Sequence, residues 1–118
     1  MSEVIPNPVT NAAELLSQYA AGKRDFTSIE LSTVNLRSTN LKGADLSYAE
    51  MSGTDLSGAN LRGVDLSYAN LNEVNLSGAN LRGAILIGTD LRHAKLETAD
   101  LREADYDPDT THFHPGFD

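Results

Sequence analysis

The sequence contains no cysteine and no tryptophan, and only 6% of its 118 residues are aromatic. Without cysteine, disulfide bonds and thiolate metal ligands are excluded. No apolar run approaches the roughly 20 residues that a membrane-spanning helix needs. Residues 1–8 lack the basic region and the apolar stretch of a secretory signal. We therefore expect a cytoplasmic protein that makes no contact with membranes.

Basic residues are also scarce. Nine Lys and Arg stand against 17 Asp and Glu, which gives a formal net charge of -8. Because a protein of this charge repels a phosphate backbone, nucleic acid is not an expected ligand. The length suffices for one domain but not for two. The sequence thus describes a small acidic domain that must be stabilised by burial of its own side chains.

An apolar residue returns at every fifth position between residues 26 and 106. These stations are Phe26, Leu31, Leu36, Leu41, Leu46, Met51, Leu56, Leu61, Leu66, Leu71, Leu76, Leu81, Leu86, Leu91, Leu96, Leu101 and Tyr106. A second row of mostly smaller residues, from Ile29 to Ala104, stands two positions before each station from Leu31 onward. The residue between the two rows is mostly Asp or Asn. A fixed period of this kind dictates the architecture of a chain.

A period of five fits neither common element. In an α-helix, five residues advance the chain by about 500°, so successive leucines would ring the helix. In a flat strand, an odd spacing sends successive side chains to opposite faces. All the leucines can point inward only if the chain turns a corner between stations. Their burial would stabilise the coil by roughly 1.5–3 kcal/mol for each side chain.

A second period gives the number of sides. The segment 58–63 recurs unchanged at 78–83, and Asp45-Leu46-Ser47-Tyr48-Ala49 recurs at 65–69. Because both repeats lie twenty positions apart, four pentads make one turn and the cross-section is square. Coils of this kind stack at strand spacing, about 4.8 Å. The sequence therefore predicts an all-β solenoid of about four coils.

The repeated motif is A-(D/N)-L-x-x. It is read at Ala44-Asp45-Leu46, Ala59-Asn60-Leu61, Ala69-Asn70-Leu71, Ala79-Asn80-Leu81 and Ala99-Asp100-Leu101. This motif resembles the pentapeptide repeat family, and the resemblance implies a right-handed quadrilateral β-helix. The stretch from Leu15 to Phe26 and the segment Thr111 to Asp118 are similar to the two ends of small cyanobacterial members.

The ends of the chain depart from the period. Residues 1–10 are expected to be a lead-in, and residues 11–22 a short capping α-helix that begins at Asn11 and covers the first coil. Residues 23–106 form the repeat domain. Residues 107–118 form a tail that packs on one face or one end.

Most residues at the corners have structural explanations. Asp and Asn before each station can bond nearby backbone groups, and glycines two residues after a station suit a turn with positive φ. Where Tyr48, Glu73 or His93 replaces glycine, we expect a different turn type. Asp45, Asp65 and Asp105 each follow a basic residue by three positions, which predicts surface ion pairs. The basic residues form one column, Lys42, Arg62, Arg82 and Arg102, whose alternative role is an anion or acidic-partner groove.

The pentad around Leu86 departs from the pattern of polar outward-facing residues. Ile85 and Ile87 flank Leu86 where Asp and Ser stand in the coil before it, and they share a side with Tyr48 and Tyr68. A group of exposed apolar residues usually marks a contact surface. Two explanations stay open: the tail, with Phe113 and Phe117, covers Ile85 and Ile87, or the four residues contact a partner or a second copy.

Motifs for chemistry are weak. Asp105-x-Asp107-x-Asp109 begins like a calcium loop, but glycine and glutamate are missing at the positions that such a loop needs. His112 and His114 lack a third metal ligand of defined geometry. We therefore expect no cofactor, no metal and no catalytic residues.

Three functions remain. The interpretation that we prefer is a non-enzymatic protein-protein interaction or scaffold module, with an unknown protein partner, in a monomer or weak homodimer. The alternative, implied by the family resemblance, is a DNA mimic that inhibits a DNA-binding enzyme such as gyrase. An enzyme or ligand-binding protein is the third, and a deep pocket with converging polar groups would favour it.

Overall fold

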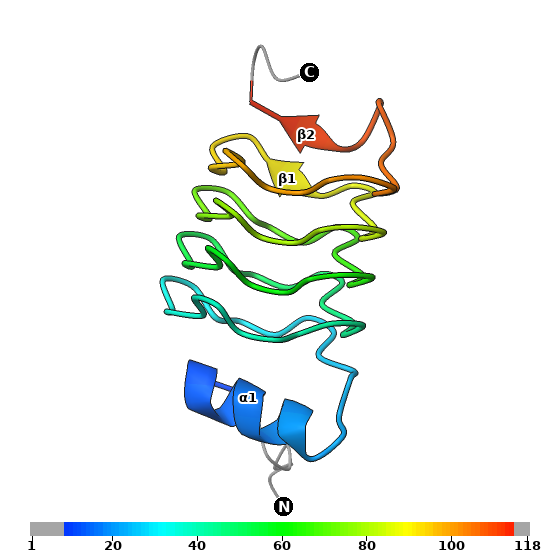
Figure 1. Cartoon of the computed structure of the whole chain (residues 1–118). Helices are drawn as coiled ribbons and strands as arrows, with labels where there is room; N and C mark the ends of the chain where they lie inside the picture. Colours follow the sequence, from blue (N-terminus) through cyan, green and yellow to red (C-terminus); the bar gives the residue numbers. More distant parts are fainter. Residues whose placement is uncertain (1–8, 115–118) are drawn as a thin grey trace, which may run out of the picture.

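The computed structural model describes residues 9–114, and its repeats wind into coils stacked along one axis (Figure 1). Helix α1 (Ala12–Ala20) lies beyond the first coil, and the strands β1 (Asp90–Leu91) and β2 (His112–Phe113) lie at the other end. Between these ends, single parallel bridges join residues twenty positions apart, from Asp25↔Asp45 to Ile85↔Asp105. The architecture is therefore a β-helix.

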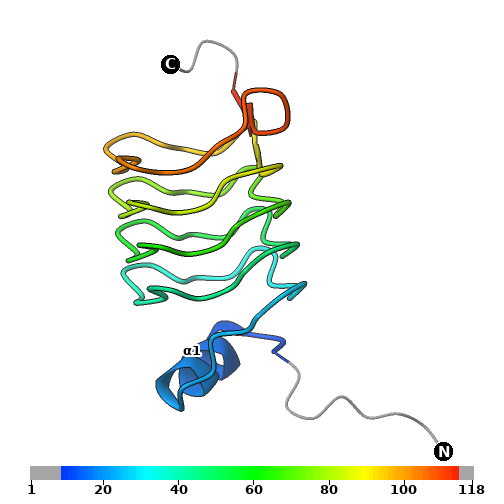
Figure 2. The ribbon, with the colours of Figure 1, turned by 90° about the vertical axis from the view of Figure 1, so that its right-hand side faces the viewer.

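The chain turns after each pentad, which gives the coil four sides that we name in chain order. The first side holds residues 25–29, 45–49, 65–69 and 85–89; the second 30–34, 50–54, 70–74 and 90–94; the third 35–39, 55–59, 75–79 and 95–99; the fourth 40–44, 60–64, 80–84 and 100–104. The view turned by 90° in Figure 2 shows the same stack of coils from an adjacent direction.

Backbone hydrogen bonds run from coil to coil. The N–H of Leu46 donates to the carbonyl of Asp65 at 2.8 Å, and the N–H of Tyr48 donates to Ser67 at the same distance. In the other direction, the N–H of Asp65 donates to Ala44 at 3.0 Å. The pattern repeats along the stack, so the backbone polar groups of the inner coils are satisfied without long strands.

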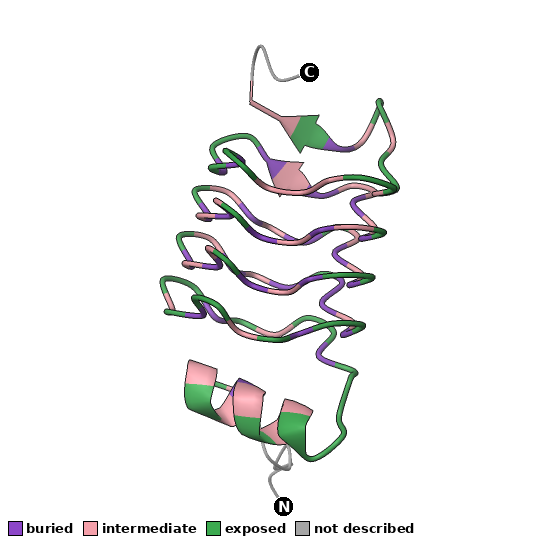
Figure 3. Cartoon of the chain, in the orientation of Figure 1, coloured by how far each residue is buried: buried purple, intermediate pink, exposed green. Residues whose placement is uncertain are grey.

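The stations form the core. From Phe26 to Leu96 every station is buried, and Leu101 is half-buried. Figure 3 shows the buried residues recurring along each coil, between exposed or half-buried neighbours. The prediction that Tyr106 also points inward is wrong, since its side chain is 55% exposed.

Tyr106 is exposed because the chain leaves the repeat after Asp105. Thr111 is buried at the end of the stack, where its hydroxyl donates to the carbonyl of Leu86 at 2.7 Å. The N–H of His112 then donates to Thr89, and β2 pairs with β1 in the register Asp90↔His112. This register spans 22 residues and not 20, so the tail continues the winding with two extra residues.

Most corners keep one backbone conformation with or without glycine. Tyr48 and Glu73 have φ values of 61° and 62°, close to the 67° of Gly58. The expectation of a different turn at Tyr48 and Glu73 is therefore wrong. The square winding imposes the positive φ that type II turns require, and the strain of a side chain there is tolerated. His93 is not among the residues with positive φ, so its corner does differ.

Helix α1 is fixed at both ends. The side chain of Asn11 accepts from the N–H of Glu14 at 2.8 Å, which is the N-cap that the sequence predicts. Leu15 is fully buried in the core cluster. Near the C-terminal end, the hydroxyl of Tyr19 donates to the carbonyl of Lys42 at 2.7 Å, and the guanidinium of Arg24 lies 3.7 Å from the centre of the Tyr19 ring.

Candidate functional site

The candidate site is the first-side surface, formed by Tyr48, Tyr68, Ile85 and Ile87. The rings of Tyr48 and Tyr68 stack, with centroids 5.3 Å apart and planes 15° apart. Both tyrosines stay exposed, at 59% and 52%. Equivalent corners of neighbouring coils are about 4.8 Å apart, and at this spacing two aromatic rings can stack with a small offset.

The two isoleucines continue this surface toward the C-terminal end. Ile85 and Ile87 are half-buried, and neither is among the residues that pack against the core. Ile85 lies between Asp65 and Asp105 in the ladder of bridges. An apolar residue thus stands between two acidic residues, with the backbones of neighbouring coils about 4.8 Å apart.

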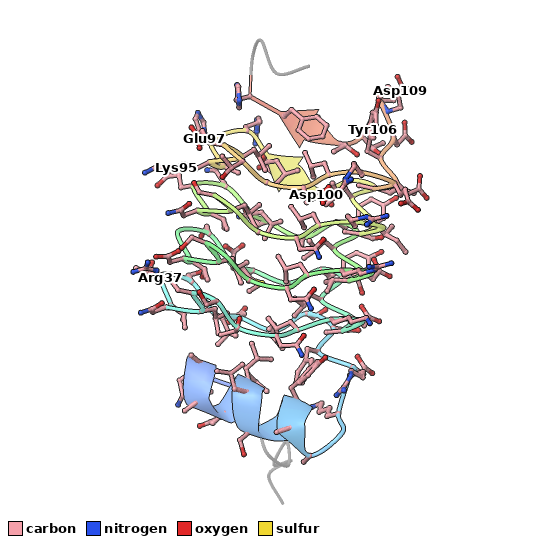
Figure 4. The ribbon with its side chains drawn as sticks, viewed as in Figure 1. Arg37, Lys95, Glu97, Asp100, Tyr106 and Asp109 are labelled. Atoms are coloured by element: carbon pink, nitrogen blue, oxygen red, sulfur yellow. The ribbon has the colours of Figure 1, made fainter. Side chains whose placement is uncertain are left out.

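The described part of the tail, up to His114, is anchored at the end of the stack. Its hydrogen bonds reach the carbonyls of Leu86 and Thr89 and the N–H of Gly88, all at the end of the stack. Phe113 packs against the core and meets Tyr106 edge-on at 5.9 Å. Phe117 lies outside the described residues. Tyr106 and Asp109 project from the same part of the tail (Figure 4).

The pentad that begins at Ile85 also differs in its backbone hydrogen bonds, a difference that the sequence analysis missed. In most pentads the Asp or Asn before the station accepts from the N–H of the residue after it, as Asp65 does from Ser67 at 2.9 Å. Ile85 has no acceptor to offer. Within residues 9–114 the N–H of Ile87 consequently has no hydrogen-bond partner. The signal in the sequence was the missing Asp or Asn, which the leucine period does not reveal.

The basic column lies on the fourth side and is only partly neutralised. Arg82 pairs with Glu103 at 2.5 Å, and Arg102 pairs with Asp100 at 2.7 Å. The hydrogen bond from Arg82 lowers the pKa of Glu103, and the bonds from Arg102 lower the pKa of Asp100 to about 2. The Nε atom of Arg82 is buried without a partner among the described residues.

The predicted ion pairs between neighbouring sides are wrong. Across residues 9–114, Asp45, Asp65 and Asp105 form none. The side chain of Asp45 instead accepts from the N–H and the hydroxyl of Ser47, at 2.9 and 2.6 Å. The carboxylate of Asp45 is therefore held by its own turn rather than by Lys42.

The third side is polar and offers a contrast. Arg37 lies 3.8 Å from Asp55, and Arg37, Lys95 and Glu97 project outward (Figure 4). Its corners carry Ser38, Gly58, Gly78 and Thr98, without an aromatic residue. Exposed large apolar side chains therefore gather on the first side and at the tail that follows it.

Within residues 9–114, no helix combines the length and the apolar character of a membrane span. The same residues contain no group of three or more His, Cys, Asp or Glu side chains that could hold a metal ion.

The fold and its surfaces define a class, the β-helical solenoid that is filled with side chains and offers flat outer faces. The chain belongs to the pentapeptide repeat family: the model described as "Pentapeptide repeats (8 copies)" matches residues 25–63 and 59–97. The resemblance read from the sequence is thus confirmed. A comparison with curated protein sequences found no match to the chain.

Solved structures include similar cyanobacterial proteins. The pentapeptide repeat protein alr5209 from Nostoc Pcc 7120 is 49% identical, with a TM-score of 0.91 over 94% of this chain and 91% of that chain. This likeness makes the fold a right-handed β-helix. Rfr23 from Cyanothece 51142 is 35% identical, with a TM-score of 0.43 over 75% of this chain and 63% of that one. HetL from Nostoc sp. strain PCC 7120, involved in heterocyst differentiation regulation, is 40% identical, with a TM-score of 0.44 over 81% and 47%.

Proposed function

We propose that this protein is a non-enzymatic protein-protein interaction module and that its first-side surface contacts the partner. The proposal rests on the pentad that contains Ile85 and Ile87. These two side chains replace the polar residues that the same side has in the coil before, Asp65 and Ser67. They contribute nothing to the core, which Leu86 fills with 1% exposure.

The isoleucines also leave one hydrogen bond of the turn unformed within residues 9–114. An Asp or Asn at position 85 would accept from the N–H of residue 87, as Asp65 does from Ser67. Sequences depart from a local rule of this kind mostly at functional sites. The stacked Tyr48 and Tyr68 enlarge the same surface, and aromatic residues are enriched where proteins meet.

The remaining features of the protein follow from this role. The function needs no cofactor and no catalytic residue, and we propose a cytoplasmic monomer or weak homodimer. The division into a lead-in (1–10), a helix (11–22), a repeat domain (23–106) and a tail (107–118) remains part of the proposal. The partner is a protein.

We also propose that α1 caps the first coil. Leu15 supplies apolar surface over the end of the core, and Tyr19 reaches the carbonyl of Lys42. Solenoids need terminal elements of this kind, because the first coil would otherwise expose its apolar interior to water. A variant that lacks residues 1–21 should aggregate or lose its unfolding transition, and full stability of that variant would contradict the cap.

Photo-crosslinking tests the contact surface. A photoreactive phenylalanine analogue at position 48 or 68 should crosslink a protein in extract of the source organism. The same analogue at position 38 or 98, at corners of the third side where Ser38 and Thr98 already hold a positive φ, serves as the control. Mass spectrometry then identifies the captured protein, and the purified pair is measured for affinity.

The affinity between the protein and the captured partner should depend on Ile85 and Ile87. Ile85→Asn with Ile87→Ser rebuilds the polar pattern of this side, so the variant should fold and should lose the partner. Crosslinks that are equally frequent on both sides, or undiminished affinity in the double variant, would exclude the first-side surface. A change in the circular dichroism of the variant would show that the fold was altered.

A further inference from the structure

We propose that the partner segment on the first-side surface is an extended peptide with an apolar residue between two basic residues. The inference rests on the proposed function and adds the chemistry of the partner. It uses three groups that lie together on this side: the isoleucines, the acidic residues beside them, and the N–H of Ile87, which has no partner within residues 9–114.

The carboxylates of Asp65 and Asp105 supply the charge. They lie one coil before and one coil after Ile85 in the same ladder. Neither is in an ion pair within the described part of the chain. The nearby cations Arg82 and Arg102 are paired with other acids. A formal net charge of -8 further favours a basic partner over an acidic one.

The spacing of these carboxylates fits an extended chain along the stack. Two coil steps separate Asp65 from Asp105, which is about 10 Å. Positions i, i+2 and i+4 of an extended peptide face the same way, and i and i+4 are about 13 Å apart. Long basic side chains at i and i+4 can therefore converge on both carboxylates while the residue at i+2 meets Ile85 and Ile87.

The backbone of Ile87 supplies a directional contact. Its N–H has no acceptor within residues 9–114, and a peptide carbonyl can provide one. Both faces of the Tyr68 ring are covered, one by Tyr48 and one by Gly88. The exposed ring of Tyr48 can take a further cation on its face. Lys23, 5.3 Å from the Phe26 ring centre, shows the same contact elsewhere in the molecule.

A second copy of the chain is a poorer occupant. Two first-side surfaces face to face would bring the carboxylates of Asp65 and Asp105 against their equivalents. Like charges brought together at an interface oppose binding. The observed charges therefore favour a different, basic chain.

The probe is a random nonapeptide library displayed on phage and selected against the full-length protein. Enriched peptides should carry Lys or Arg four positions apart, with an apolar residue midway between them. Their binding should weaken about tenfold in Asp65→Asn with Asp105→Asn, and its dependence on salt should fall. The Asn side chain at 65 keeps the turn, as Asn60 does when it accepts from Arg62 at 3.1 Å. Asp55→Asn on the third side is the matched control and should leave binding unchanged.

Amide chemical shifts locate the peptide. Addition of an enriched peptide should shift the N–H of Ile87 downfield, and Ile85→Asn should abolish this change because Asn supplies the missing acceptor. Enrichment of acidic peptides, no enrichment at all, or equal affinity for the double Asn variant would overturn the proposal. If crosslinking at Tyr48 still captures a protein whose contact segment lacks basic residues, the proposed function stands and this inference alone fails. Self-association that disappears in Ile85→Asn would assign the surface to a second copy.

Discussion

The ring of Tyr68 lies against the backbone of Gly88 in the next coil. A Cβ atom at Gly88 would stand 2.3 Å from Cδ1 of the Tyr68 ring and 2.4 Å from Cε1. The ring thus occupies the space that any other residue at position 88 would fill. On its other side the same ring stacks on Tyr48. The absence of a side chain at one corner therefore sets the position of the aromatic pair.

Gly88→Ala should displace the Tyr68 ring. The methyl group cannot coexist with the ring, and a φ of 70° adds strain for any side chain. We expect the free energy of unfolding to fall by more than the roughly 1 kcal/mol that positive φ alone costs. Near-ultraviolet circular dichroism should also lose the contribution of the stacked tyrosines.

Gly83→Ala is the control for this change. Gly83 has a φ of 68°, and a Cβ atom there would meet nothing within 4 Å. Its substitution should therefore show the strain of the backbone alone, with an unchanged tyrosine signal. Equal effects of the two substitutions on stability and on circular dichroism would refute the contact between Tyr68 and Gly88.

Thr54 holds together a turn that lacks its own hydrogen bond. Its hydroxyl donates to the carbonyl of Leu31 at 2.6 Å and accepts from the N–H of Val34 at 3.4 Å. Thr54→Val should leave both backbone groups unpaired, at a cost of about 1–3 kcal/mol in the free energy of unfolding.

The hydroxyl of Thr89 makes a bond of the same kind, to the carbonyl of Leu66 at 2.7 Å. That carbonyl also accepts from the N–H of Ala69, so Thr89→Val should cost only about 0.5–1.5 kcal/mol. Urea unfolding of the two variants measures the difference. A larger effect at Thr89 than at Thr54 would contradict the bridging role of Thr54.

The interior of the fold could be predicted from the sequence because one physical requirement repeats. Each leucine must be buried, and only one winding buries all of them. The rule fails at Tyr106, since two additional residues in the tail bring Thr111 over the core in its place. Because the pentad period has already ended at this point, the sequence gives no sign of the two inserted residues.

The outer surface was less predictable, because outward residues do not decide the winding. The carboxylates at Asp45 and Asp65 bond their own turns, a local contact that charge spacing does not predict. The tyrosine at position 48 takes the conformation of a glycine because the coil demands it. The isoleucines could be identified by the break in pattern, but only the three-dimensional structure shows that the N–H of Ile87 has no partner within residues 9–114.

The protein should not inhibit DNA gyrase. A DNA mimic needs a continuous negative surface, and Lys42, Arg62, Arg82 and Arg102 form a basic column on the fourth side. Of these, Lys42 and Arg62 have no ion pair within residues 9–114. A supercoiling assay at micromolar protein, with a quinolone as the positive control, should show unchanged activity. Inhibition that survives removal of contaminating nuclease would restore the DNA-mimic interpretation.

Stability should fall in acid, chiefly between pH 4 and pH 2. Hydrogen bonds from Arg102 lower the pKa of Asp100 from 3.8 to about 2, and the Ser57 hydroxyl lowers the pKa of Asp55. A carboxyl whose pKa is lower in the folded state binds protons more tightly in the unfolded state. Its contribution is therefore complete above the unfolded pKa and is lost as the pH falls through the folded pKa.

Asp100→Asn removes the charge at position 100 but keeps the side-chain hydrogen bond of the turn. The Asn oxygen can still accept from the N–H of Arg102, as Asn80 accepts from that of Arg82 at 3.0 Å. The variant should therefore fold and should be somewhat less stable than the native protein at pH 7. Its stability should also change less between pH 4 and pH 2, because position 100 no longer titrates. Urea unfolding at pH 5, 4, 3 and 2 measures both curves, and parallel curves would show that the Asp100–Arg102 contact contributes nothing to acid sensitivity.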